Sequence, residues 1–142
     1  MKTYIKFLTH LFNRSLLKVF LIFFIIILII NVLEQIEFFK NVDLNFFYLL
    51  FLSFLNTPSI LFEILPFIFL ISAQVFFIYL IDNKELEIFK YMGLNNLNII
   101  KIISVYTFIT SLLFVVIFYN ISAILENSYL SIKNKYSEDN KY

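Results

Sequence analysis

The sequence predicts an all-α membrane protein: three transmembrane helices, with an N-terminal amphipathic helix and a short cytoplasmic helix between the last two spans. Of its 142 residues, 61% are hydrophobic and 15% are charged, whereas soluble domains have about 45–50% apolar and about 25% charged residues. A chain this small could not bury so much apolar surface in water. The excess must face lipid or a large partner, which excludes a free-standing soluble enzyme.

Residue types that carry chemistry are scarce in this chain. It has no Cys, one His and one Gly, and its net charge is +1. A net charge this small does not indicate a nucleic-acid-binding protein, which would carry a basic patch. A single Gly cannot build a phosphate-binding loop. We therefore predict no catalytic residue, no cofactor, no metal and no nucleic-acid partner. Any ATP hydrolysis would belong to another chain.

Residues 1–14 are expected to form the amphipathic helix, because apolar and polar side chains separate at helical spacing. Such a helix lies at the membrane surface and binds anionic lipid, and we interpret the lone His10 as part of its solvated face. The apolar face would hold Tyr4, Ile5, Leu8, Leu11 and Phe12, and the polar face Lys2, Lys6, His10 and Arg14.

Three uncharged runs mark the spans, which we place at 15–34, 58–81 and 99–125. The first uncharged run, residues 19–33, is shorter than the roughly 20 residues that a bilayer core needs. Leu16 and Leu17 extend it, and Lys18 can reach the interface with its amine. Residues 126–142 follow the third span as a polar tail.

The loop 35–57 contains an apolar helix, 45–55, that is too short to cross and should lie at the interface. The sequence Asn-Thr-Pro-Ser at 56–59 should end this helix, with Pro58 near the start of the second span. Pro66 falls inside that span and should kink it, because it removes a backbone hydrogen bond. Glu63 is an ionisable group at membrane depth and thus a functional candidate, although interfacial solvation also explains it.

The Lys and Arg residues of the flanking segments predict the orientation. Four of them lie between the N-terminus and Lys18, near the inner end of the first span, and three lie around the connection between the last two spans, whereas Lys40 is the one cation in loop 35–57. The N-terminus and the connection are therefore predicted to be cytoplasmic. Loop 35–57 and the C-terminal tail are predicted to lie outside.

The connection at 82–98 is the long polar segment on the predicted cytoplasmic side. Leu86, Phe89, Met92 and Gly93 fall at helical spacing on one side of it, and Gly93 should let the chain turn out of the helix. Such a helix is either a plain connector or a docking element that inserts into a groove of a cytoplasmic partner. The pattern leaves both interpretations open.

These residues together resemble the LptF/LptG (YjgP/YjgQ) permease family. The resemblance covers residues from about 4 to about 130, and its most specific part is Glu85-Leu86 with Gly93 eight residues after the Glu. The other matching residues, in order, are Tyr4, Leu33-Glu34-Gln35-Ile36, Pro58, Leu61-Phe62-Glu63-Ile64-Leu65-Pro66 and Asn83-Lys84.

The resemblance implies a permease subunit of an ABC transporter that exports lipopolysaccharide from the bacterial inner membrane toward the outer membrane. Residues 82–94 would be the coupling helix, which docks on an LptB-like cytoplasmic ATPase. The expected docking residues are Glu85, Leu86, Phe89, Met92 and Gly93. Further implied partners are a second permease subunit of the LptF/LptG type, an LptC-like membrane protein and lipopolysaccharide itself.

The lipid path departs from the family pattern. The outer end of the first span offers basic residues to lipopolysaccharide phosphates in the family, but here it carries Glu34 and Glu37 with Lys40 as the one cation, and carboxylates repel phosphate. Together with Glu63 these are the candidate lipid-path residues. The chain stops where the family has a periplasmic jellyroll, so we expect a truncated or split subunit. The alternative function is a small structural or regulatory membrane protein that packs into a larger complex without moving lipid.

Overall fold

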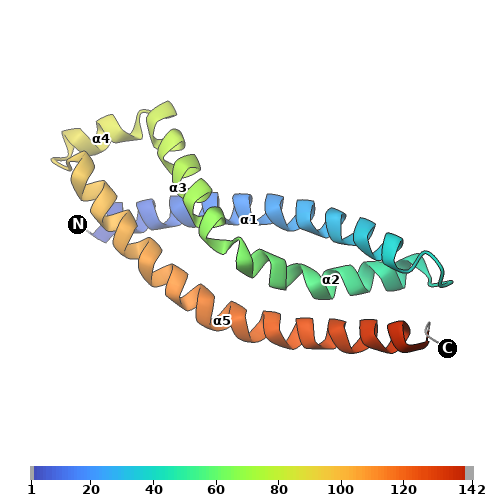
Figure 1. The fold of residues 1–142 in the computed structure, drawn as a ribbon. Helices are drawn as coiled ribbons and strands as arrows, with labels where there is room; N and C mark the ends of the chain where they lie inside the picture. The colour runs from blue at the N-terminus through green and yellow to red at the C-terminus, as the bar shows by residue number, and fades with distance from the viewer. Residues whose placement is uncertain (1, 140–142) are drawn as a thin grey trace. The chain divides into compact units, whose positions relative to one another are not determined.

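The computed structural model describes residues 2–139, and these form five α-helices without a strand (Figure 1). Contacts within the chain divide it into two compact units. Unit 1 comprises the chain up to Leu21 together with Leu65–Leu113, and unit 2 comprises Ile22–Ile64 and the chain from Phe114 onward. The all-α prediction is confirmed. The helices are α1 (Lys2–Phe38), α2 (Phe46–Glu63), α3 (Leu65–Asp82), α4 (Glu85–Tyr91) and α5 (Asn96–Asp139).

Four of these helices, α1, α2, α3 and α5, are long and apolar enough to cross a membrane. The prediction of three such segments counted 45–55 as an interfacial helix too short to cross. In the structure α2 has 18 residues, because it runs through the expected break at 56–59. The described residues therefore hold four apolar helices of spanning length, against three predicted transmembrane helices.

The two prolines act differently from the prediction. Pro58 lies inside α2, where the hydroxyl of Thr57 donates to the carbonyl of Ser53 (2.7 Å) and the helix continues. The helix instead ends at Glu63, because the φ of −95° and ψ of 6° at the following Ile64 leave helical geometry. Pro66 is the second residue of α3, in the first turn, where its missing N–H breaks no helical bond. The expected kink within a span is replaced by a break between two helices.

Helix α1 contributes one apolar face to unit 1. The segments predicted at 1–14 and 15–34 form one continuous helix that ends at Phe38. The ring of Phe12 packs edge-on against Phe76 of α3 (5.9 Å between centroids) and Tyr106 of α5 (6.0 Å). The buried residues of this face, at the spacing of an amphipathic helix, are Leu8, Leu11, Phe12, Ser15, Leu16 and Val19.

The apolar face expected to insert into lipid is therefore largely occupied by the chain itself. Leu8, Leu11 and Phe12 are buried, whereas Ile5 is 38% exposed and Tyr4 is half-buried. The reason is that α3 and α5 offer apolar faces of their own at this level. The opposite face behaves as predicted, because Lys6, His10 and Arg14 are exposed; the side chain of Lys2 lies outside the described set.

Unit 2 has an apolar cluster at Phe39, Leu49, Leu52, Leu55 and Tyr129. Residues 126–139, predicted as a polar tail, belong to helix α5, and 140–142 lie outside the described residues. The helix continues because apolar side chains recur at helical spacing among the polar ones. Those that pack against this cluster are Leu125, Ile132 and Tyr136.

Candidate functional site

Helix α4 is a short helix between α3 and α5 with well-defined ends. It begins after Lys84, whose φ of 56° is left-handed and separates it from α3. Glu85 and Glu87 lie in its first turn and Lys90 in its last, an arrangement that complements the partial charges at helix ends. The predicted helical connection is therefore present, over residues 85–91.

Gly93 terminates α4 as the sequence predicts. Its φ is +85°, a left-handed conformation that favours glycine. The amide of Leu94 donates to the carbonyl of Phe89 (2.9 Å), and that of Gly93 donates to the carbonyl of Lys90 (3.0 Å), which is the pattern of a Schellman motif. A Cβ at this position would meet no atom within 4 Å, so backbone conformation alone explains the glycine.

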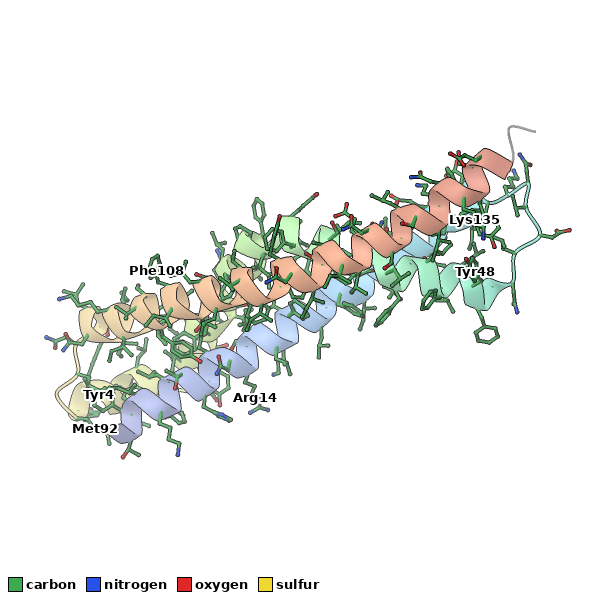
Figure 2. All side chains as sticks on the ribbon, turned by 90° about the horizontal axis from the view of Figure 1, so that it is seen from below. Tyr4, Arg14, Tyr48, Met92, Phe108 and Lys135 are labelled. Atoms are coloured by element: carbon green, nitrogen blue, oxygen red, sulfur yellow. The ribbon has the colours of Figure 1, made fainter. Side chains whose placement is uncertain are left out.

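A groove of about 600 Å³ lies between the start of α1 and α4. Of the predicted docking residues, Glu85, Phe89 and Met92 line it, whereas Leu86 and Gly93 do not. Figure 2 shows Tyr4 of α1 and Met92 close to each other, as expected of two residues that line this groove. The full lining is Thr3, Tyr4, Phe7, Glu85, Ile88, Phe89, Met92 and Leu94.

Phe89 belongs to the packing of the chain itself. It is 5% exposed, and its ring lies 6.0 Å from that of Phe7 in α1. The residues with free apolar surface are Ile88 and Tyr91 of α4 and Met92, the C-cap of this helix, which are 49%, 91% and 70% exposed. They stand at positions i, i+3 and i+4 and so share one face. Phe89 therefore lies against α1, whereas the exposed face also includes Ile88 and Tyr91, which the sequence interpretation did not single out.

The candidate lipid-path residues do not form one cluster. Glu34 and Glu37 are exposed near the end of α1, and Lys40 is exposed in the following turn. Glu63 is the last residue of α2, so the length of that helix, about 27 Å at 1.5 Å per residue, lies between it and the turn. All four side chains are accessible.

Unit 2 also contains a polar seam that the sequence interpretation missed. The side-chain amide of Asn31 donates to the hydroxyl of Thr57 (3.1 Å), and the side-chain amide of Asn56 donates to the side-chain Oδ1 of Asn31 (3.1 Å). Gln35 donates to the hydroxyl of Tyr129 (2.7 Å). Asn31 and Thr57 are fully buried, and hydrogen bonds of this kind hold helices together where lipid supplies no hydrophobic force. The sequence does contain a sign of this seam, because Asn31 and Gln35 are polar residues four positions apart within an apolar run.

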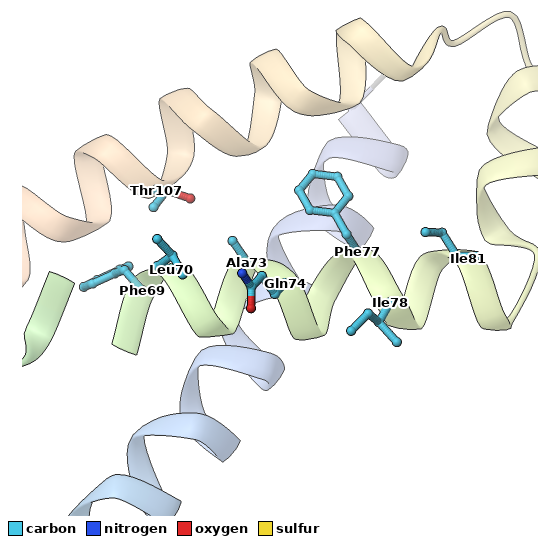
Figure 3. A pocket seen from close by; sticks show the side chains of 8 residues that line it. All are labelled: Phe69, Leu70, Ala73, Gln74, Phe77, Ile78, Ile81 and Thr107. Carbon is cyan, nitrogen blue, oxygen red and sulfur yellow. The ribbon is translucent and has the colours of Figure 1, made fainter. Parts of the chain in front are cut away.

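Two further observations limit the chemistry of the site. A hollow of about 610 Å³ between α3 and α5 has Gln74 and Thr107 as its polar lining residues, the other six being apolar (Figure 3). No group of three or more His, Asp or Glu side chains within residues 2–139 is placed to hold a metal ion. The hollow can accommodate apolar groups, but it offers no acid, base or metal ligand.

An all-helical chain with several apolar helices of spanning length is a multi-pass membrane protein. Within that class, the chain belongs to the LptF/LptG family: the family model described as lipopolysaccharide export system permease LptF/LptG matches residues 6–142. The resemblance carried by Glu85, Leu86 and Gly93 is thereby confirmed at the level of the family. Comparisons with curated proteins and with solved structures give no match.

Proposed function

We propose that this chain is a permease subunit of an ABC transporter that moves lipopolysaccharide out of the bacterial inner membrane, and that α4 docks on a cytoplasmic ATPase. The observation that carries the proposal is a short helix between two apolar helices with Ile88, Tyr91 and Met92 exposed on one face, in a chain of this permease family. An apolar stripe at i, i+3 and i+4 is the pattern of helix-in-groove recognition.

We assign the docking residues by the exposure of their side chains. Tyr91 and Met92 would fill a groove of the ATPase, since buried aromatic and apolar anchors carry most of the energy of an interface. Glu85 is half-buried in the α1–α4 groove and would lie at the rim of the contact. Phe89 takes a different role: it positions α4 by packing on Phe7.

The packing of unit 1 supports a mechanical path from α4 into the apolar helices. Phe89 contacts Phe7 of α1, and one and a half turns further Phe12 contacts Phe76 of α3 and Tyr106 of α5. Close-packed side chains transmit displacement because the interior has low compressibility. Movement of α4 by the ATPase would therefore shift α1 at Phe7 and act on α3 and α5 through Phe12.

We further propose three crossings, with the N-terminus inside and α5 ending outside. Helices α2 and α3 are joined by one residue, Ile64, whereas an αα-hairpin needs a loop of about 2–5 residues. The two helices would thus serve one crossing. The exposed cations of the first α1 turns and of α4 then share the cytoplasmic side. A second permease subunit and an LptC-like protein would complete the transporter.

Co-purification with the cytoplasmic ATPase tests the docking. A Tyr91→Ala/Met92→Ala double variant should lose the ATPase, because two exposed anchors at about 2 kcal/mol each together weaken binding roughly a thousandfold. The matched control is Lys90→Ala, an exposed residue of the same helix, which should retain it. Equal retention by the double variant and the control would make α4 a plain connector and favour a structural membrane protein that does not couple to an ATPase.

A further inference from the structure

We propose that the exposed face of α1 in unit 1 binds an anionic phospholipid, with the lipid phosphate in a recess beside Lys6 and His10. The recess adjoins the α1–α4 groove, with which it shares Thr3 and Phe7, but Ile88, Tyr91 and Met92 of the proposed docking face do not line it. The site does not require the proposed function to hold, because the contacts that carry it lie within α1 and α5.

The recess is a shallow hollow of about 480 Å³ on α1. Its lining supplies the ammonium group of Lys6, the imidazole of His10, the hydroxyl of Thr3 and the amide of Asn13, which are donors suited to phosphate oxygens. The hydroxyl of Thr9 already donates to the carbonyl of Lys6 (3.0 Å). Lys6 and His10 are exposed and thus accessible to a headgroup. The lining residues are Thr3, Lys6, Phe7, Thr9, His10 and Asn13.

The amide of Asn13 is oriented by α5. The hydroxyl of Tyr106 donates to the Oδ1 atom of Asn13 (2.8 Å), and the Tyr106 ring is held by its edge-on contact with Phe12 (6.0 Å). With its oxygen engaged, Asn13 offers its Nδ2 hydrogens to a ligand. An anion that needs donors is therefore favoured in the recess over a cation.

The charged side chains along this face, those of Lys6, Arg14 and Lys18, are all cationic. Lys6, His10, Arg14 and Lys18 follow at intervals of four residues and all are exposed; Figure 2 shows Arg14 projecting from α1. No Asp or Glu occurs in the first 33 residues of the sequence. Each Lys or Arg near a membrane surface adds about 1 kcal/mol of attraction to anionic lipid.

Exposed apolar residues on the same face identify the ligand as a lipid. Leu17 and Leu21 follow His10 after seven and eleven residues, which places them two and three turns further along the same side of the helix. Leu17 is 62% exposed and Leu21 is 49% exposed. A lipid whose phosphate lies in the recess would thus place its acyl chains along Leu17 and Leu21. A soluble anion would gain no binding energy from these two residues.

Native mass spectrometry of the full chain in a neutral detergent, titrated with phosphatidylglycerol or phosphatidylcholine, tests the site. We expect phosphatidylglycerol to bind at least tenfold more tightly than phosphatidylcholine. In a Lys6→Gln/Arg14→Gln variant this affinity should fall roughly twenty-five-fold, about fivefold for each lost cation. The charge-matched control Lys133→Gln/Lys135→Gln removes two cations from unit 2 and should bind as the wild type does.

Two further measurements distinguish a lipid site from misfolding and from a site for free phosphate. Lys6→Arg keeps the charge and should bind normally, which separates loss of charge from loss of folding. Millimolar inorganic phosphate should not displace the lipid; displacement would show a site for free phosphate and overturn the assignment. Equal affinity for the two lipids, or an equal loss in the Lys133→Gln/Lys135→Gln control, would also overturn it.

Discussion

Replacing Phe89 by Ala distinguishes a positioning residue from a docking residue. The ring is 5% exposed and lies 6.0 Å from that of Phe7. Truncating a buried Phe to Ala typically costs about 3–5 kcal/mol, because it removes transfer free energy and leaves a cavity. The adjoining groove of about 600 Å³ leaves room for neighbouring side chains to relax, so the expected loss is about 3 kcal/mol.

The assay is denaturant unfolding of the purified chain in mixed micelles, in the absence of any ATPase. The comparison variant is Met92→Ala on the same helix, which removes a side chain that is 70% exposed and should change the free energy of unfolding by less than about 0.5 kcal/mol. Unchanged stability in Phe89→Ala, with loss of the ATPase on co-purification, would refute the assignment and return Phe89 to the docking surface.

Three other predictions concern separate features. Asn31→Leu should lower the stability of the chain by about 1–2 kcal/mol, because the half-buried amide of Asn56 loses its acceptor and the buried hydroxyl of Thr57 loses a donor, keeping only its bond to Ser53. Asn120→Leu, whose exposed amide donates to the carbonyl of Val116, should be neutral in the same unfolding assay. Gly93→Ala should cost about 1–2 kcal/mol through its φ of +85°, and Gly93→Asn less; thermal unfolding that finds Ala and Asn equal to Gly would contradict the backbone explanation. Reporter fusions at residue 90 should be cytoplasmic and those at 42 and 135 external, and external activity at residue 90 would overturn the proposed orientation.

Much of the architecture could be predicted because apolar composition and helical spacing act locally. The excess of apolar residues predicts membrane helices, and the Gly93 turn follows from one residue whose conformational freedom is needed at a helix end. The most specific part of the family resemblance is also local, namely Glu85-Leu86 with Gly93 eight residues after the Glu. These features depend on few residues that lie close together in the sequence.

The errors arose where tertiary contacts override local signals. The sequence Asn-Thr-Pro-Ser reads as a helix break, but Thr57 and Asn56 bond to Asn31 of another helix and α2 continues. Spacing correctly placed Phe89 on an apolar face, but it could not show that α1 covers that face. The periodicity of Leu125, Tyr129, Ile132 and Tyr136 was hidden among polar residues that occupy the other side of α5.

Site-specific photo-crosslinking from position 92 in intact cells tests the central proposal most directly. A photoreactive residue at Met92, which is 70% exposed, should crosslink the cytoplasmic ATPase. The same residue at Lys135, exposed near the end of α5, should give no such product. A crosslink from position 135 but not from position 92 would contradict both the docking role of α4 and the proposed orientation.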